Sequence, residues 1–243
     1  MVASMNLSFR IPMLTSFVAS AALAGAPATA PAAAPATEAA VDASPVSPPP
    51  ATGIRTFELD AKASSIVIQV FKTGAAAALA HDHVVDAREF SGSIVADAAD
   101  VTTARVEVTA QTASFINDDP KLRSKYGLDP GMSDKDRKSV EENMKAEDQL
   151  DVKSFPIVKF VSTSVSKAAD GKATLAGKLT LHGVTLPVSM PLDAKVDANT
   201  ITGNATFRVN TSAYGITPFS ALLGAVKNKD EIVIHLHLVA IAK

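Results

Sequence analysis

Histidines are the residues of this chain best suited to chemistry, and four of the five fall in two His-x-His pairs. His81 and His83 enclose an aspartate in LAHDHVVD, and His235 and His237 repeat the spacing in IVIHLHLV. Imidazole nitrogens bind zinc and copper, but such a site needs three or four ligands. One interpretation is therefore a zinc or copper site that uses His81, His83, His235 and His237. The other is two strands that carry histidines at strand spacing.

The elements that position these pairs decide between the two interpretations. Residues two apart in a strand point to the same side. In the last strand Ile234 and Leu236 therefore share an apolar face, and His235 and His237 lie on the opposite one. If the apolar face lines an interior, these two histidines point outward. A closed barrel pairs its first and last strands, however, and this pairing could bring the two histidine pairs within reach.

Catalytic motifs are scarce. The chain has no cysteine, which excludes disulfides, iron–sulfur clusters and thiol catalysis. Neither a Gly-x-Ser-x-Gly motif nor a glycine-rich phosphate loop occurs. A hydrolase built from His81, Asp82 and a serine stays open, but the spacing selects no serine. Asp118 and Asp119 are adjacent and point apart in an extended chain, so we expect a solvated loop there. We predict a protein that is not an enzyme.

The first 24 residues have the layout of a secretory signal peptide. Arg10 precedes an apolar run from Ile11 to Leu23, and small residues that fit a cleavage site follow. The run is too short to cross a hydrocarbon core of about 30 Å as a helix. We therefore expect a periplasmic or secreted protein with no transmembrane segment after cleavage. Residues 25–53 are rich in Ala and Pro and are expected to form a disordered linker.

Residues 54–243 alternate apolar and polar residues in short runs separated by turn residues, which predicts an all-β domain. About eight strands, mostly antiparallel, suit a closed barrel or a two-sheet sandwich. One polar segment near 133–146 predicts an amphipathic helix, because Ser133 and Asp136 resemble a capping box. Val140 and Met144 give this helix a narrow apolar stripe. Either the helix lies across the barrel or its mouth, or it is a solvated surface insertion.

The charge pattern limits the partners. The formal net charge is −2 at pH 7 and no basic stripe occurs. Nucleic acid is therefore not an expected partner. The sequence leaves open whether the protein forms a homodimer.

Four stretches in order resemble the YceI-like family: AREFSGSI, LDVKSFPIVKFVST, KLTLHGVTLPV and TSAYGI. The resemblance runs from Phe57 to the C-terminus. It implies a lipocalin-like closed antiparallel β-barrel, usually periplasmic, that encloses an isoprenoid or another long apolar molecule. The chain resembles a divergent branch, because Thr211 and Ala213 stand where typical members have Arg and Asp. HDH likewise replaces a single His followed by Leu-Gly.

The resemblance and the alternation together predict the residues that contact such a ligand. No cofactor is required in this interpretation, and a bound isoprenoid or other lipid is the expected partner. His182, in the strongest family stretch, is expected to order a turn. A filled core and a hollow one would give the same alternation of apolar and polar residues, so the sequence does not distinguish them. The predicted ligand-binding residues are Ile66, Ile68, Val106, Val108, Phe160, Leu179, Leu181, Phe207, Ile234 and Leu236, with His81 and His83 near a polar head.

Overall fold

The computed structural model describes residues 53–97, 99–167 and 172–243. The predicted signal peptide, and the predicted linker up to residue 52, lie outside the described residues. Within the described part of the chain, the strands form one sheet, and it closes on itself as the alternation and the resemblance predicted.

Eight antiparallel strands form the closed barrel, in the order β1-β4-β5-β7-β8-β9-β10-β12. Closure comes from pairing of the first strand with the last, in a register that places Phe57 opposite Ala242. Phe57 is fully buried, so the seam is part of the core. The barrel strands are β1 (Ile54–Leu59), β4 (Phe90–Asp97), β5 (Asp100–Gln111), β7 (Ile157–Lys167), β8 (Ala173–Leu181), β9 (Val184–Val196), β10 (Thr200–Asn210) and β12 (Val226–Ala242).

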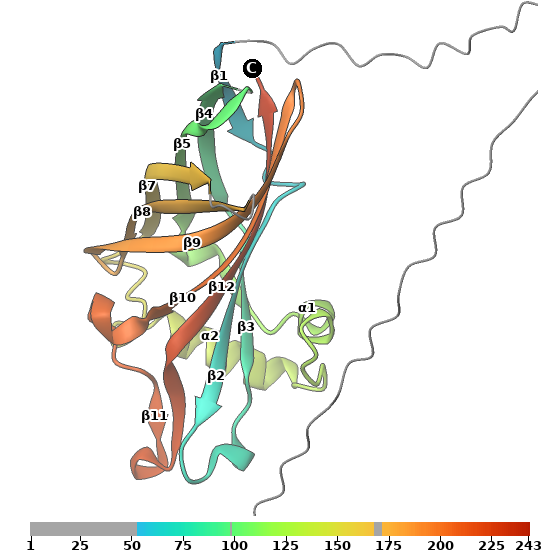
Figure 1. Ribbon diagram of the computed structural model, residues 1–243. Coiled ribbons are helices and arrows are strands. Elements are labelled where there is room, and N and C mark those ends of the chain that lie inside the picture. Colours follow the sequence, from blue (N-terminus) through green and yellow to red (C-terminus); the bar gives the residue numbers. More distant parts are fainter. Residues whose placement is uncertain (1–52, 98, 168–171) are drawn as a thin grey trace, which may run out of the picture. The chain divides into compact units, whose positions relative to one another are not determined.

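A smaller extension of the sheet grows from the long strand β12. β2 (Ser65–Thr73) pairs with β12, β3 (His83–Ala87) pairs with β2, and β6 (Phe115–Asn117) pairs with β3. The short strand β11 (Ser220–Ala221) adds to the other side of β12. β12 is 17 residues long, and it pairs with β10 of the barrel and with β2 of the extension. In Figure 1, β2 runs beside β12, and β3, which begins at His83, runs beside β2.

Two α-helices interrupt the strands between β6 and β7. α1 (Pro120–Lys125) begins at Asp119, whose carboxylate accepts the backbone N–H groups of Lys121 and Leu122. α2 (Asp134–Lys145) is the predicted amphipathic helix, and its N-terminus is capped by Ser133 as expected. In Figure 1 the two helices lie near the β2–β3 end of the sheet, α1 beside β3. Short 3-10 turns complete the elements: η1 (Ala77–Leu79), η2 (Thr112–Ser114), η3 (Thr211–Tyr214) and η4 (Leu222–Gly224).

Candidate ligand cavity

The barrel encloses a hollow instead of a filled core. A cavity of about 410 Å³ opens within it, and its wall is mostly aliphatic and aromatic. Every residue predicted to contact a ligand lies on this wall. They are Ile66, Ile68, Val106, Val108, Phe160, Leu179, Leu181, Phe207, Ile234, Leu236, His81 and His83. Their contact with a ligand remains a prediction.

The cavity face follows from strand alternation. Ile234 pairs with Ile68 and Leu236 pairs with Ile66 in the β12–β2 register. Directly paired residues of antiparallel strands present their side chains on the same face. Both pairs therefore point into the cavity, and Phe160 joins them from the far wall. The sheet presents a continuous apolar surface to anything held inside.

The helix α2 covers part of the cavity, which decides between the two sequence interpretations of this segment. Val140 and Met144, the predicted apolar stripe, line the cavity together with Asn143. Leu150 continues the cover just beyond the helix. The opposite face is charged, and Lys138 and the other exposed side chains there meet water. The helix is thus a wall of the cavity and not a solvated insertion.

The four-histidine metal site is not formed, which corrects the alternative drawn from the spacing. His83 lies on β3 and His81 in the loop before it, and both line the cavity. His235 and His237 lie on the opposite, outward face of β12, where His235 contacts Gln69 and His237 contacts Asn204. β2 also separates β3 from β12, so the closing pairing of first and last strands does not join the two pairs. Among the described residues, no group of three or more His, Cys, Asp or Glu side chains is placed to hold a metal.

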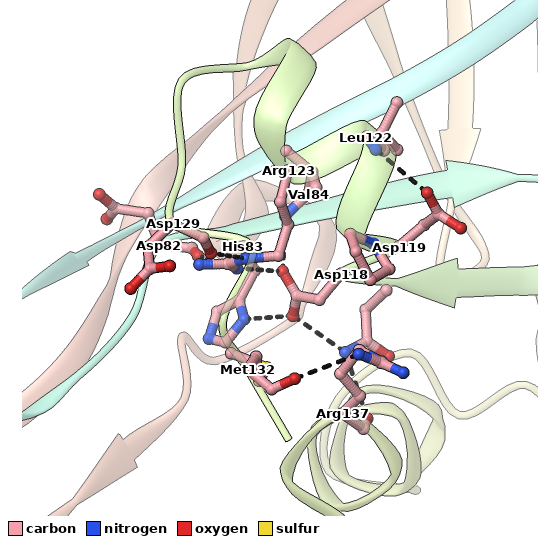
Figure 2. Close-up of polar contacts among 12 residues, drawn as sticks. Asp82, His83, Val84, Asp118, Asp119, Leu122, Arg123, Asp129, Met132 and Arg137 are labelled. Atoms are coloured by element: carbon pink, nitrogen blue, oxygen red, sulfur yellow. Dashed lines mark hydrogen bonds and ion pairs between the residues drawn. The ribbon is translucent and has the colours of Figure 1, made fainter. Parts of the chain in front are cut away.

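A buried polar cluster stands at the His83 end of the cavity, and Asp118 is its centre (Figure 2). The His83 Nδ1 atom lies 2.7 Å from Asp118 Oδ2, and Arg123 Nη1 lies 2.5 Å from Asp118 Oδ1. Asn117 Nδ2 donates to Asp118 Oδ2 at 3.0 Å, and the backbone N–H of Val84 donates to Oδ1 at 3.2 Å. Asp118 is fully buried, and its charge is balanced by Arg123, which is only 3% exposed.

The electrostatics of this cluster keep Asp118 ionised. Burial alone raises the pKa of a carboxyl group because it disfavours the charged form. Hydrogen bonding and charge from His83, with hydrogen bonds from Asn117 and Arg123, outweigh burial and lower the Asp118 pKa to about 2. At neutral pH the carboxylate is therefore only an acceptor. The bond to His83 must then use an Nδ1–H donor, which fixes the orientation of the imidazole ring.

The expectation of a solvated Asp118–Asp119 loop was wrong for Asp118. Its backbone has φ 57°, so the chain is not extended there and the side chain turns inward. Asp119 behaves differently because it caps α1 and remains partly exposed. Asp119 followed by Pro120 is a helix-start signal, since Pro suits the first helical position. That signal could have revealed α1, and with it Arg123, which sequence analysis missed.

His182 has a structural role in the turn between β8 and β9. Its Nδ1 atom lies 3.2 Å from the carbonyl oxygen of Tyr214, and its ring packs on Phe155 with centroids 4.2 Å apart. It does not belong to the cavity wall. This arrangement agrees with the expectation that His182 orders the turn.

Fold and cavity together define a class: closed antiparallel β-barrels with an apolar interior, a polar cluster at one end and a helical cover. The sequence model of the YceI-like domain family matches residues 57–240 of this chain, so the chain belongs to the YceI-like family. A UPF0312 protein of Pseudomonas putida is 30% identical over 135 residues, which are 53% of this chain and 61% of that protein. Another, from Pseudomonas fluorescens, is 38% identical over 106 residues, 42% of this chain and 44% of that protein. The chain thus matches less than two thirds of the length of these relatives.

Two solved structures share the fold. BcnA of Burkholderia cenocepacia has a TM-score of 0.55 at 22% identity, over 74% of this chain and 98% of that one. A domain from Saccharophagus degradans, described as polyisoprenoid-binding and implicated in plant cell wall breakdown, has a TM-score of 0.51 at 12% identity. That likeness covers 77% of this chain and 98% of the other. Among the described helices, none is long and apolar enough to span a bilayer.

Proposed function

We propose that the protein is an exported binding protein that holds one long apolar molecule, such as an isoprenoid, inside its barrel. The observation that carries the proposal is the apolar cavity of about 410 Å³. Small-molecule sites in proteins fall in the range of about 300–1,000 Å³ and are mostly apolar. The description of the Saccharophagus degradans domain as polyisoprenoid-binding supports the same class of ligand.

The export part of the proposal rests on residues 1–24, which have the layout of a signal peptide. The periplasm is the compartment we propose, by analogy with the family. Binding, and not catalysis, is the proposed activity, because the cavity wall is dominated by side chains that bury apolar surface. No metal or cofactor is needed for it.

Native mass spectrometry of the purified protein tests the proposal directly. We expect a co-purifying mass of a lipid, or stoichiometric binding of added geranylgeraniol, under gentle conditions. In Phe160→Asp a charge enters the cavity wall, and retention should fall at least tenfold. Val161→Asp is the matched control, because the neighbouring side chain on β7 is 38% exposed and lies off the cavity wall. Absence of both endogenous and added ligand would reject the proposed function.

A further inference from the structure

Two hydrogen-bond acceptors near the polar end of the cavity have no donor in the described part of the chain. The first is His83 Nε2. His83 donates its Nδ1 hydrogen to the ionised Asp118, so in the neutral form of the ring the other nitrogen is an acceptor. Within the described residues Nε2 makes no hydrogen bond, and it is not among the buried unpaired atoms. His83 lines the cavity with its side chain 16% exposed, so Nε2 is open to the cavity.

The second acceptor is Asn117 Oδ1. The amide orientation is set by its nitrogen, which donates to Asp118 Oδ2 at 3.0 Å and to the carbonyl oxygen of Arg137 at 3.2 Å. Both amide hydrogens are therefore used, and Oδ1 is left buried without a donor among the described residues. Buried polar atoms are nearly always paired. Because the Asn117 oxygen has almost no accessible surface, His83 Nε2 is the acceptor of the two that a ligand can reach.

Both residues lie at the same end of the cavity. Asn117 pairs directly with Val85 in the β3–β6 register, and Val85 and His83 are two residues apart on β3. All three side chains therefore share one face of the sheet, and all three line the cavity. Asp118 Oδ2 anchors both His83 and Asn117, which holds the two acceptors close together.

The Lys and Arg side chains near this end of the cavity are already engaged by other groups. Lys229 is the one Lys or Arg among the described residues of the cavity wall, and its Nζ lies over the Phe71 ring, 5.7 Å from the centroid. The Arg123 guanidinium is engaged by Asp118 and by the backbone carbonyls of Asp82 and Asp129. A phosphate or carboxylate would thus meet the His83 acceptor and no unengaged guanidinium.

We propose that this end of the cavity recognises a ligand head that carries an O–H group, an alcohol or a phenol, which donates its one hydrogen to His83 Nε2. A ketone, ether or ester head brings acceptors alone and leaves His83 Nε2 unpaired. The inference rests on the proposed function, since the apolar tail must occupy the cavity for the head to reach this end. The class of ligand is therefore a long-chain alcohol or phenol.

The test compares two probes that share one tail: geranylgeraniol and its methyl ether. We expect the full chain to bind the alcohol about tenfold more tightly than the ether in calorimetric titrations at pH 8. His83→Asn keeps a nitrogen donor at the position of Nδ1 and removes Nε2, so the preference should fall to about threefold or less. His235→Asn is the matched control on the outward face and should keep the full preference.

The outcomes separate this inference from the proposed function. Equal binding of alcohol and ether by the unmodified protein would overturn the hydroxyl recognition and leave the apolar carrier intact. An undiminished preference in His83→Asn would also overturn it. Failure of both probes to bind would reject the proposed function, and the inference with it. The comparison in the unmodified protein is decisive even if a variant fails to fold.

Discussion

The Asp118–Arg123 pair leads to a quantitative prediction about stability. In Asp118→Asn the Arg123 guanidinium, 3% exposed, loses the carboxylate that it pairs with. Removal of one partner of a buried ion pair costs about 3–5 kcal/mol, because the other charge remains buried and uncompensated. Asparagine retains an oxygen acceptor, so we expect the lower end, about 3 kcal/mol at pH 7.

The pH dependence gives an independent magnitude. The Asp118 pKa falls from 3.8 to about 2 in the folded protein. At 1.36 kcal/mol per pKa unit, the shift corresponds to about 2 kcal/mol. Because the folded pKa is the lower one, this stability is fully present above pH 4. It is lost as the pH falls from about 4 through 2, when the carboxylate becomes protonated in the folded state too.

Urea unfolding followed by circular dichroism measures both effects. The free-energy gap between the unmodified protein and Asp118→Asn should be about 3 kcal/mol at pH 7 and should shrink by about 2 kcal/mol between pH 4 and pH 2. Asp119→Asn is the control, since asparagine caps a helix as well as aspartate and should change stability by less than about 0.5 kcal/mol at pH 7. A gap that is absent at pH 7, or constant down to pH 2, would refute the reasoning.

Three further predictions concern the cavity and its surroundings. Gly177→Val should destabilise the barrel by about 1–3 kcal/mol in urea unfolding, because an added Cβ would lie 2.5 Å from the Phe160 ring. Met144→Lys should reduce lipid retention in native mass spectrometry at least fivefold, because it places an ammonium group in the cavity wall. Glu142→Lys, on the exposed face of α2, is the control and should leave lipid retention unchanged. His235→Ala should leave both lipid retention and zinc content after dialysis unchanged, because this side chain lies on the outward face.

The cavity wall was predictable from sequence because it depends on local periodicity. Ile66 and Ile68 share a face whatever their partner strand is, and the same holds for Ile234 and Leu236. Closure of the sheet then turns these faces toward one interior. Helix α2 was also predictable from local sequence, because its cap Ser133 and its apolar stripe, Val140 and Met144, lie within a few helical turns of each other. Whether the interior was filled was not predictable, because a packed core uses the same alternation.

The polar cluster was not predictable, because it depends on contacts between distant segments. Asp118 reaches His83 only because β6 pairs with β3 across about thirty intervening residues. The inward turn of Asp118 also depends on a positive φ that is uncommon for residues other than glycine. Spacing alone suggested that His83 would join His235, but β2 lies between their strands.

The position of this cluster argues for a role beyond stability. A buried ion pair contributes little net stability compared with apolar residues of similar volume. Here Asp118 and Arg123 form such a pair, and the side chain they orient, His83, opens into an otherwise apolar cavity. The ionised carboxylate holds the imidazole in one orientation before any ligand enters, so recognition would need no rearrangement of the ring. If the protein holds a long apolar ligand, as proposed, this cluster is a fixed polar end that sets the direction in which the ligand lies in the barrel.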